Sequence, residues 1–128
     1  APTAAAAAIG PLRYFRGRPD YTDYVFQFTN TVAREVAKKF PDRWLSAYAY
    51  YWTENAPSFA VERNVIPFLT ADRSQWFDPG FAVQDQKLIE RWCRSGAGLV
   101  GMYDYYEGAP YLVPRPTLYA AMRSIPFG

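Results

Sequence analysis

Acidic side chains follow directly after two apolar stretches of the sequence, where carboxylates could carry out acid–base chemistry. The stretch 98–102 has no charge and leads through a tyrosine into Asp104. The stretch 43–52, largely uncharged and rich in aromatic rings, likewise leads into Glu54. Because the chain contains no histidine, Ser-His-Asp and Cys-His catalysis are impossible within it. Acid–base chemistry must therefore come from carboxylates, tyrosines or lysines.

Paired carboxyl groups are the usual apparatus of glycoside hydrolysis, about 5 Å apart in retaining enzymes and about 6.5–9.5 Å apart in inverting ones. Asp104 is the first catalytic candidate, because a carboxyl group at the end of an apolar strand is partly desolvated and its pKa rises toward that of a general acid. Glu54, with Trp52 close by in the sequence, is the second. The alternative is structural: each acid caps a loop or pairs with Arg73 or Arg94.

Aromatic and polar side chains around these acids suit a sugar ligand. The apolar C–H faces of a pyranose lie on rings, while its hydroxyl groups bond to polar side chains. Arg73 could bind the carboxylate of a uronic acid. The alternative is that about half of the rings fill the core, where we place Trp44 and Trp92. The expected substrate-binding residues are Trp52, Asn55, Asp72, Arg73, Trp76, Tyr105, Tyr106 and Glu107, with Tyr50 and Tyr111 as further rings.

Composition and charge exclude several classes of protein. Aromatic residues make up 19% of the chain, with eleven tyrosines, and such an excess is more typical of wet, ligand-facing surfaces than of a core alone. The net charge is +2 and the basic residues are scattered, so nucleic-acid binding is not indicated. No apolar run approaches the roughly 20 residues of a membrane span, and we expect neither a metal nor a cofactor. The single cysteine, Cys93, excludes an internal disulfide and is expected in the core.

Hydrophobic periodicity predicts an alternation of helices and strands. Residues 1–20, with a run of alanines and several prolines, are expected to be an extended leader or linker, and residues 21–128 a single α/β domain. The first helix is expected from about 22 to 40, with Val25, Phe28, Val32, Val36 and Phe40 facing inward. The later elements are expected as strands at 43–52 and 64–71, a helix at 80–95, a strand at 98–105 and a helix at 117–124.

Apolar strands that alternate with helices indicate parallel strands covered by helices. In such sheets the ligand site lies beyond the carboxyl ends of the strands, so the acidic strand ends are expected to meet at one rim. Closing a barrel takes eight strand–helix units and about 250 residues. We therefore expect a partial (β/α) barrel of about three strands and three helices. The proline of "NVIPFLTA" is expected at an edge or a bulge.

Several segments of the chain resemble a bacterial family, the domain-of-unknown-function family 4838. They are "YTDYVFQFTNTVAREVAKKFPDRWLSAYAYYWTENAP", "NVIPFL" and "LIERWCRSGAGLVGMYDYYEGAPYLVPRP". The family's members resemble glycoside hydrolases built on a TIM barrel, and the resemblance covers residues 20–126 as the C-terminal part of that barrel. It implies a carbohydrate-active protein in a periplasmic or secreted setting, and it carries over no catalytic pair.

Three functions remain open at this stage. The first is a glycoside hydrolase-like domain that acts on or binds a plant or bacterial polysaccharide. The second is a sugar-binding module with the same cleft and no productive carboxylate pair. The third is a barrel fragment without activity of its own, which covers its exposed strand edges by self-association. The expected partners are therefore a carbohydrate ligand and either a second copy or the missing remainder of the barrel.

Overall fold

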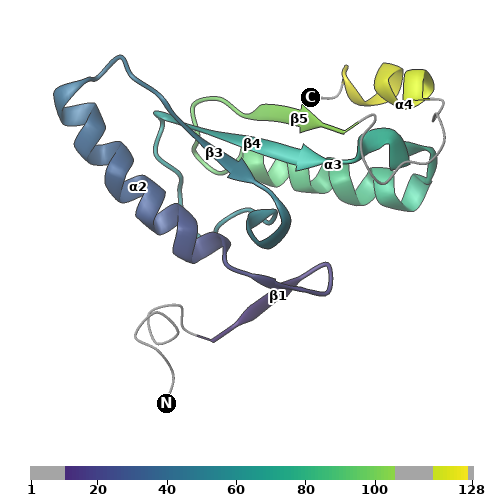
Figure 1. The fold of residues 1–128 in the computed structure, drawn as a ribbon, viewed down its shortest axis with the longest axis horizontal. Helices are drawn as coiled ribbons and strands as arrows, with labels where there is room; N and C mark the ends of the chain where they lie inside the picture. The colour runs from purple at the N-terminus through teal and green to yellow at the C-terminus, as the bar shows by residue number, and fades with distance from the viewer. Residues whose placement is uncertain (1–10, 106–116, 127–128) are drawn as a thin grey trace.

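The protein is a mixed α/β domain, seen in a computed structural model that describes residues 11–105 and 117–126. Along the chain a long helix precedes two of its parallel strands, and a second long helix precedes the third strand (Figure 1). The elements are β1 (Arg13–Phe15), β2 (Arg18–Asp20), α2 (Thr22–Lys39), β3 (Leu45–Ala49), the 3₁₀ turn η1 (Tyr51–Thr53), β4 (Val65–Ala71), the 3₁₀ turn η2 (Arg73–Phe77), α3 (Pro79–Cys93), β5 (Gly101–Asp104) and α4 (Thr117–Ser124).

The central sheet has three parallel strands in the order β3-β4-β5. Leu45 pairs with Val65 at the first position of the β3–β4 ladder, and Ala71 pairs with Asp104 at the last position of the β4–β5 ladder. Because the strands run in the same direction, their carboxyl ends lie at one edge of the sheet. The described strands form no closed barrel. The expected partial β/α fold is confirmed.

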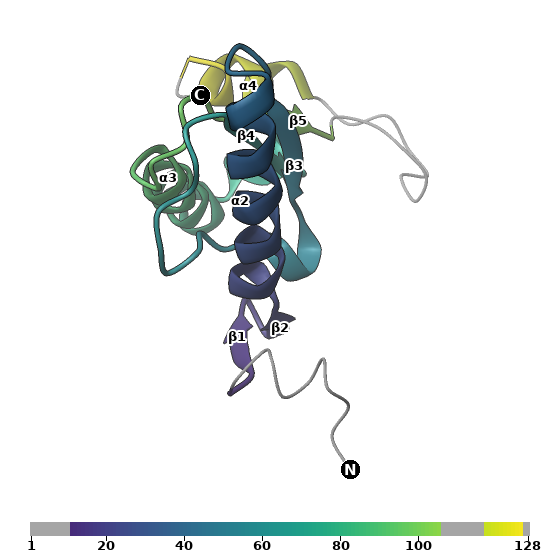
Figure 2. The ribbon, with the colours of Figure 1, turned by 90° about the vertical axis from the view of Figure 1, so that its left-hand side faces the viewer.

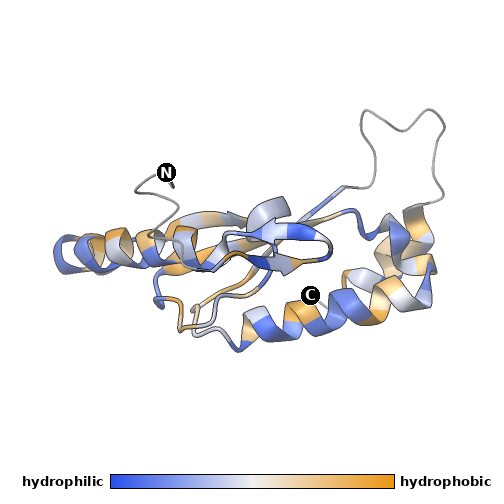
Figure 3. Cartoon of the chain, turned by 90° about the horizontal axis from the view of Figure 1, so that it is seen from below, coloured by the Kyte–Doolittle hydropathy of each residue, from blue (hydrophilic) through white to orange (hydrophobic). Residues whose placement is uncertain are grey.

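Both long helices lie on the same side of this sheet (Figure 2). The ring centroids of Phe26 in α2 and Trp92 in α3 are 4.9 Å apart, and both side chains are fully buried. Residues that alternate along the strands face this core, and hydrophilic and hydrophobic residues alternate along the helices (Figure 3). The buried core consists of Phe26, Ala33, Ala49, Val61, Val65, Leu69, Trp76, Ala82, Leu88, Ile89 and Trp92.

Pro67 lies in the central strand of the sheet, where a proline removes a hydrogen-bond donor. It pairs with Ala47 of β3, but the ladder to β5 begins one residue later, at Phe68 with Gly101. At Pro67 the strand is therefore still an edge on the β5 side, where a missing N–H is tolerated. Pro67 thus lies at an edge, as expected, although β4 as a whole is the central strand.

The buried face of α2 differs from the predicted one. Phe28 and Phe40, expected to face inward, are exposed, whereas Asn30 is buried. The Asn30 amide donates to the Ala60 carbonyl at 2.8 Å and accepts from the Glu62 N–H at 2.9 Å. A polar residue that binds two backbone groups of the 60–62 segment thus takes a core position, which hydrophobic periodicity does not detect.

Two further core predictions are wrong. Cys93 is exposed, because it lies one residue beyond Trp92 on α3 and so turns about 100° away from the buried stripe. Trp44 is 50% exposed, since it precedes β3 at the amino end of the sheet, and only Trp92 lies in the core as predicted.

Residues 13–20 form an antiparallel hairpin, in the segment where the sequence predicts an extended leader. β1 and β2 pair from Arg13 with Asp20 to Phe15 with Arg18. Asp20 fixes the hairpin to the domain, since its carboxylate accepts from the backbone of Thr22 at 3.0 Å and from the Asn55 amide at 3.0 Å. Burial alone would raise the pKa of Asp20, but these hydrogen bonds and nearby Arg13 lower it.

Candidate functional site

The carboxyl ends of the three parallel strands bring the predicted site segments to one edge of the sheet. Tyr50 follows β3, Asp72 follows β4 and Tyr105 follows β5. The Tyr105 N–H donates to the Ala71 carbonyl at 3.0 Å, so the last residues of β4 and β5 remain in register to the rim. The predicted meeting of these strand ends is therefore found in the structure.

A pocket of about 240 Å³ opens at this edge. Its walls come from the β1–β2 hairpin, η1, the end of β4, η2 and α3, so segments far apart in the sequence enclose it. Two carboxylates, two guanidinium groups and two phenol rings face the same small volume. The lining residues are Arg16, Arg18, Tyr50, Tyr51, Glu54, Thr70, Ala71, Asp72, Gln75 and Phe81.

Glu54 is the most buried carboxyl group of the pocket. Its side chain forms an ion pair with Arg16 of the hairpin. Its backbone is also fixed, because the indole N–H of Trp92 donates to the Glu54 carbonyl at 2.9 Å. Burial raises the pKa of Glu54 above its usual 4.5, although Arg16 opposes this. A carboxyl group with a raised pKa is suited to donate a proton.

Two pocket residues adopt left-handed backbone conformations. Arg16 has φ 49° and Tyr51 has φ 57°, and among the described residues no other non-glycine side chain has a positive φ. Arg16 and Gly17 (φ 75°) form the two-residue turn between β1 and β2. This conformation costs an L-residue about 1–2 kcal/mol. The hairpin turn accounts for the conformation of Arg16, whereas the strained backbone of Tyr51 is of the kind that clusters at functional sites.

Asp72 lines the same pocket and also begins η2. Its carboxylate accepts from the backbone and the hydroxyl group of Ser74, and from the Gln75 amide at 3.4 Å. These donors fix the Asp72 carboxylate at the pocket wall. Asp72 therefore caps a loop, which is the structural alternative stated for the acids. Its position in the pocket wall also places it within reach of a ligand.

Arg73 and Trp76 lie beneath the pocket in a buried polar network, and not on its surface as predicted. Both are 1% exposed. The Arg73 guanidinium bonds to Asp85 at 2.8 Å and to Asp104, and the Trp76 indole N–H donates to Asp85 at 3.0 Å. Arg73 is committed to two carboxylates, so it does not bind a uronic acid here. Its pairing with Asp104 is the structural alternative that the sequence left open.

Asn55 and Trp52 have contrasting surroundings after η1. The Asn55 amide donates to Asp20, and its carbonyl accepts from the Ala56 N–H at 3.0 Å, so this side chain holds the hairpin. Trp52 is 54% exposed and packs edge-on against Tyr51, with ring centroids 5.0 Å apart. Trp52 is therefore available to a ligand, whereas the polar atoms of Asn55 are engaged within the domain.

Exposed tyrosines continue from the pocket across the face of the sheet that is opposite the helices. The Tyr50 and Tyr105 centroids are 6.3 Å apart, those of Tyr105 and Tyr103 are 5.5 Å apart, and those of Tyr103 and Tyr48 are 5.9 Å apart. We call these four residues the tyrosine track. Partial desolvation and the neighbouring phenols raise the pKa of Tyr105 above 10.0, so its hydroxyl group stays protonated at neutral pH.

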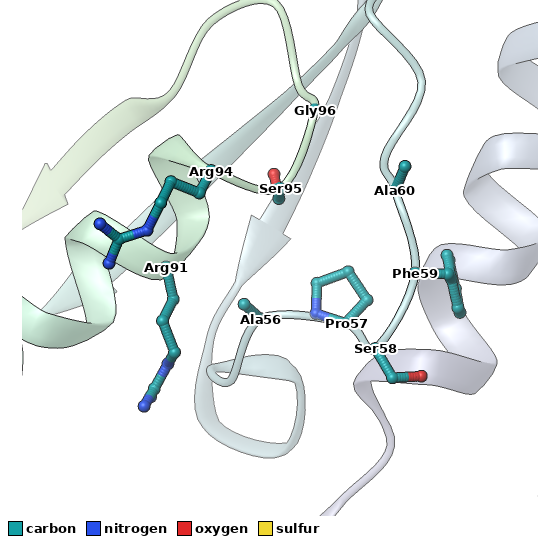
Figure 4. A pocket seen from close by; sticks show the side chains of 9 residues that line it. All are labelled: Ala56, Pro57, Ser58, Phe59, Ala60, Arg91, Arg94, Ser95 and Gly96. Carbon is teal, nitrogen blue, oxygen red and sulfur yellow. The ribbon is translucent and has the colours of Figure 1, made fainter.

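A larger hollow of about 440 Å³ lies between the 56–60 segment and the end of α3 (Figure 4). No carboxylate lines it. The Arg94 guanidinium extends away from Pro57 on the facing wall and pairs with Glu90, while the Ser58 hydroxyl donates to Asp23 at 2.7 Å. Without a carboxylate in its lining, this hollow offers less acid–base chemistry than the smaller pocket at the sheet edge.

A comparison with known protein families finds a match over most of the chain. The family described as a domain of unknown function, DUF4838, matches residues 12–125. The chain belongs to this family. Because the DUF4838 match begins at residue 12, it includes the β1–β2 hairpin that forms one wall of the pocket. Neither a curated protein nor a solved structure matches the chain.

Several features of this DUF4838 domain bear on the remaining predictions. Tyr106, Glu107 and Tyr111 lie outside the described residues. Within 11–105 and 117–126, no group of three or more acidic or cysteine side chains is placed to hold a metal ion. No helix in that same part of the chain has the length and apolar character needed to cross a membrane.

Sequence reasoning missed the hairpin arginines, Arg16 and Arg18, and the buried Asp85. The hairpin has a sequence signal, since Arg16-Gly17 separates two short segments and glycine favours such a two-residue turn. Asp85 has a weaker one: it occupies a core position of α3, in line with Ala82, Leu88 and Ile89. A charged residue in an apolar stripe indicates a buried partner.

Proposed function

We propose that this DUF4838 domain binds carbohydrate in the pocket at the carboxyl edge of its parallel sheet. The observation that carries the proposal is the combination of ring faces with paired charges: Tyr50, Tyr51 and exposed Trp52 stand at or beside a pocket that contains Glu54 and Asp72. Aromatic rings offer an apolar surface to the C–H faces of a pyranose, and carboxylates accept hydrogen bonds from its hydroxyl groups.

The size of the site supports a sugar chain of several units. The pocket, at about 240 Å³, is smaller than the roughly 300–1,000 Å³ of sites that enclose drug-sized ligands. It therefore accommodates about one sugar ring. The tyrosine track leads away from it over the open face of the sheet, with successive centroids 5.5–6.3 Å apart. Further units of a polysaccharide would lie on these rings.

The proposal is tested by comparing two tryptophan variants. Trp52→Ala is expected to weaken binding of a polysaccharide found by a mixed glycan screen about tenfold, because it removes a stacking ring beside the pocket. Trp44→Ala is the matched control, since Trp44 is similarly exposed but lies at the other end of β3. The measurement is calorimetric titration of both variants. Equal affinities for the two, or no glycan bound by the unaltered chain, would contradict the proposal.

Hydrolysis of the bound glycan is a second candidate function, favoured by the environment of Glu54. Burial raises the pKa of this carboxyl group, as expected for a general acid. Asp72 is the second carboxylate lining the same pocket. Asp104, the first catalytic candidate from the sequence, pairs with buried Arg73, and in this proposal it supports the rim and does not donate the proton.

A further inference from the structure

We propose that the ligand of this pocket is an anionic sugar, and that Arg18 binds its acidic group. The inference rests on the proposed carbohydrate site and adds the charge class of the ligand. The acidic group is a carboxylate, as in a uronic acid, or a sulfate ester. Arginine binds either anion with paired hydrogen bonds, because its planar guanidinium matches two oxygen atoms at once.

Arg18 carries an exposed guanidinium group whose charge opposes the burial-driven rise in the pKa of nearby Glu54 without a direct ion pair. It lines the pocket and is exposed, and among the described residues no carboxylate forms an ion pair with it. Its guanidinium carbon lies 4.4 Å from the centroid of the Tyr51 ring. This cation–π contact orients the guanidinium and leaves its N–H donors free for a ligand. An oriented cation with free donors at the mouth of a pocket is a site for an anion.

The other charged side chains of the pocket have polar partners within the domain. Arg16 forms an ion pair with Glu54. Asp72 accepts hydrogen bonds from Ser74 and Gln75. Arg16 and Asp72 are thus already held by partners within the domain, and the N–H donors of the Arg18 guanidinium face the pocket for an acidic ligand.

The backbone of the site fixes Arg18 where it is needed. The tight turn at Arg16 and Gly17 places Arg18 opposite Phe15 in the hairpin, and the N–H of Tyr21 donates to the Trp52 carbonyl at 2.8 Å. The hairpin is thereby attached to η1, the element that carries Tyr51. Both residues of the cation–π pair thus belong to segments that are bonded together, so the guanidinium is preorganised.

The test compares tetrasaccharides with and without acidic groups. Calorimetric titration is carried out with tetragalacturonate, its methyl ester, neutral galactotetraose and a sulfated galactotetraose. We expect an anionic tetrasaccharide to bind about tenfold more tightly than its neutral counterpart, as one charge-assisted contact provides. Arg18→Gln is expected to reduce this preference to less than about threefold, whereas Arg43→Gln, an exposed arginine outside the pocket, is expected to keep it.

The possible outcomes separate this inference from the proposed function. Tighter binding of tetragalacturonate assigns the site to a carboxylate, and tighter binding of the sulfated sugar assigns it to a sulfate ester. If the neutral sugars bind as tightly as the anionic ones, and binding still depends on Trp52, the inference is overturned while the carbohydrate site stands. If none of the four binds, the inference is overturned, and the carbohydrate site is decided separately by the mixed glycan screen. A preference that survives Arg18→Gln also overturns the inference.

Discussion

Replacement of Arg73 by methionine is expected to lower the free energy of unfolding by about 3–5 kcal/mol, because it breaks a buried ion pair and leaves one charge uncompensated. Arg73 is 1% exposed and bonds to Asp85, which is 0% exposed. Without the guanidinium, Asp85 keeps the Trp76 indole as its donor in the described part of the chain. Asp104 at the end of β5 loses the same partner.

Arg94→Met provides the matched control for this change. Arg94 also pairs with an acid, Glu90, but both side chains are exposed and the pair lies one helical turn apart. Its loss is expected to change stability by no more than about 0.5 kcal/mol. Denaturant unfolding of both variants gives the two values. A second variant, Arg73→Met with Asp85→Leu, removes both charges and is expected to recover part of the stability. A loss below about 1 kcal/mol for Arg73→Met would contradict a structural role for the network.

Glu54→Gln has the largest expected effect on activity. If the bound glycan is hydrolysed, this variant is expected to lower kcat/KM by about 10²–10⁴, the contribution of a general acid. The glutamine keeps the size of the side chain and an oxygen that can accept from Arg16, while it removes the transferable proton. Glu62→Gln is the control, because Glu62 pairs with Arg34 outside the pocket. Equal activity in the two variants would show that Glu54 is not the acid.

The pH dependence follows from the direction of the Glu54 pKa. A general acid must be protonated, so activity is expected below the pKa of Glu54 and is lost as the pH rises through it. Burial places that pKa above 4.5. The same direction applies to stability: the folded state holds this proton more tightly than the unfolded state, so the contribution of Glu54 is most favourable at low pH and declines as the pH rises through its pKa. A pH–rate profile without this descending limb would contradict the assignment.

The order of helices and parallel strands could be predicted because it depends on local periodicity. Apolar runs such as 64–71 and the alternation with amphipathic helices specify β4 and its neighbours without any knowledge of contacts. The meeting of Asp72 and Tyr105 at one edge then follows from parallel strand direction alone. The face of α2 could not be predicted, since buried Asn30 depends on backbone groups at 60 and 62.

The chemistry of individual side chains at the rim depended on partners that the sequence does not place. Arg73 and Trp76 follow a strand end, the usual position of ligand-binding residues. They are buried because both donate to Asp85 of α3, and the sequence does not show this contact. Arg18, in contrast, was not predicted as a site residue because its segment gave no structural signal. It lies in a segment without periodicity, and only the paired strands of the hairpin bring it to the Tyr51 ring.

The most direct test of the account follows the tryptophan indole N–H signals by NMR as oligosaccharide is added to isotope-labelled protein. Trp52 and Trp44 are both exposed, at opposite ends of β3. A sugar bound at the carboxyl edge of the sheet is expected to shift the Trp52 signal together with backbone signals of the hairpin, and to leave Trp44 unchanged. Shifts confined to the 56–60 segment and the end of α3, where the larger hollow lies, would contradict it.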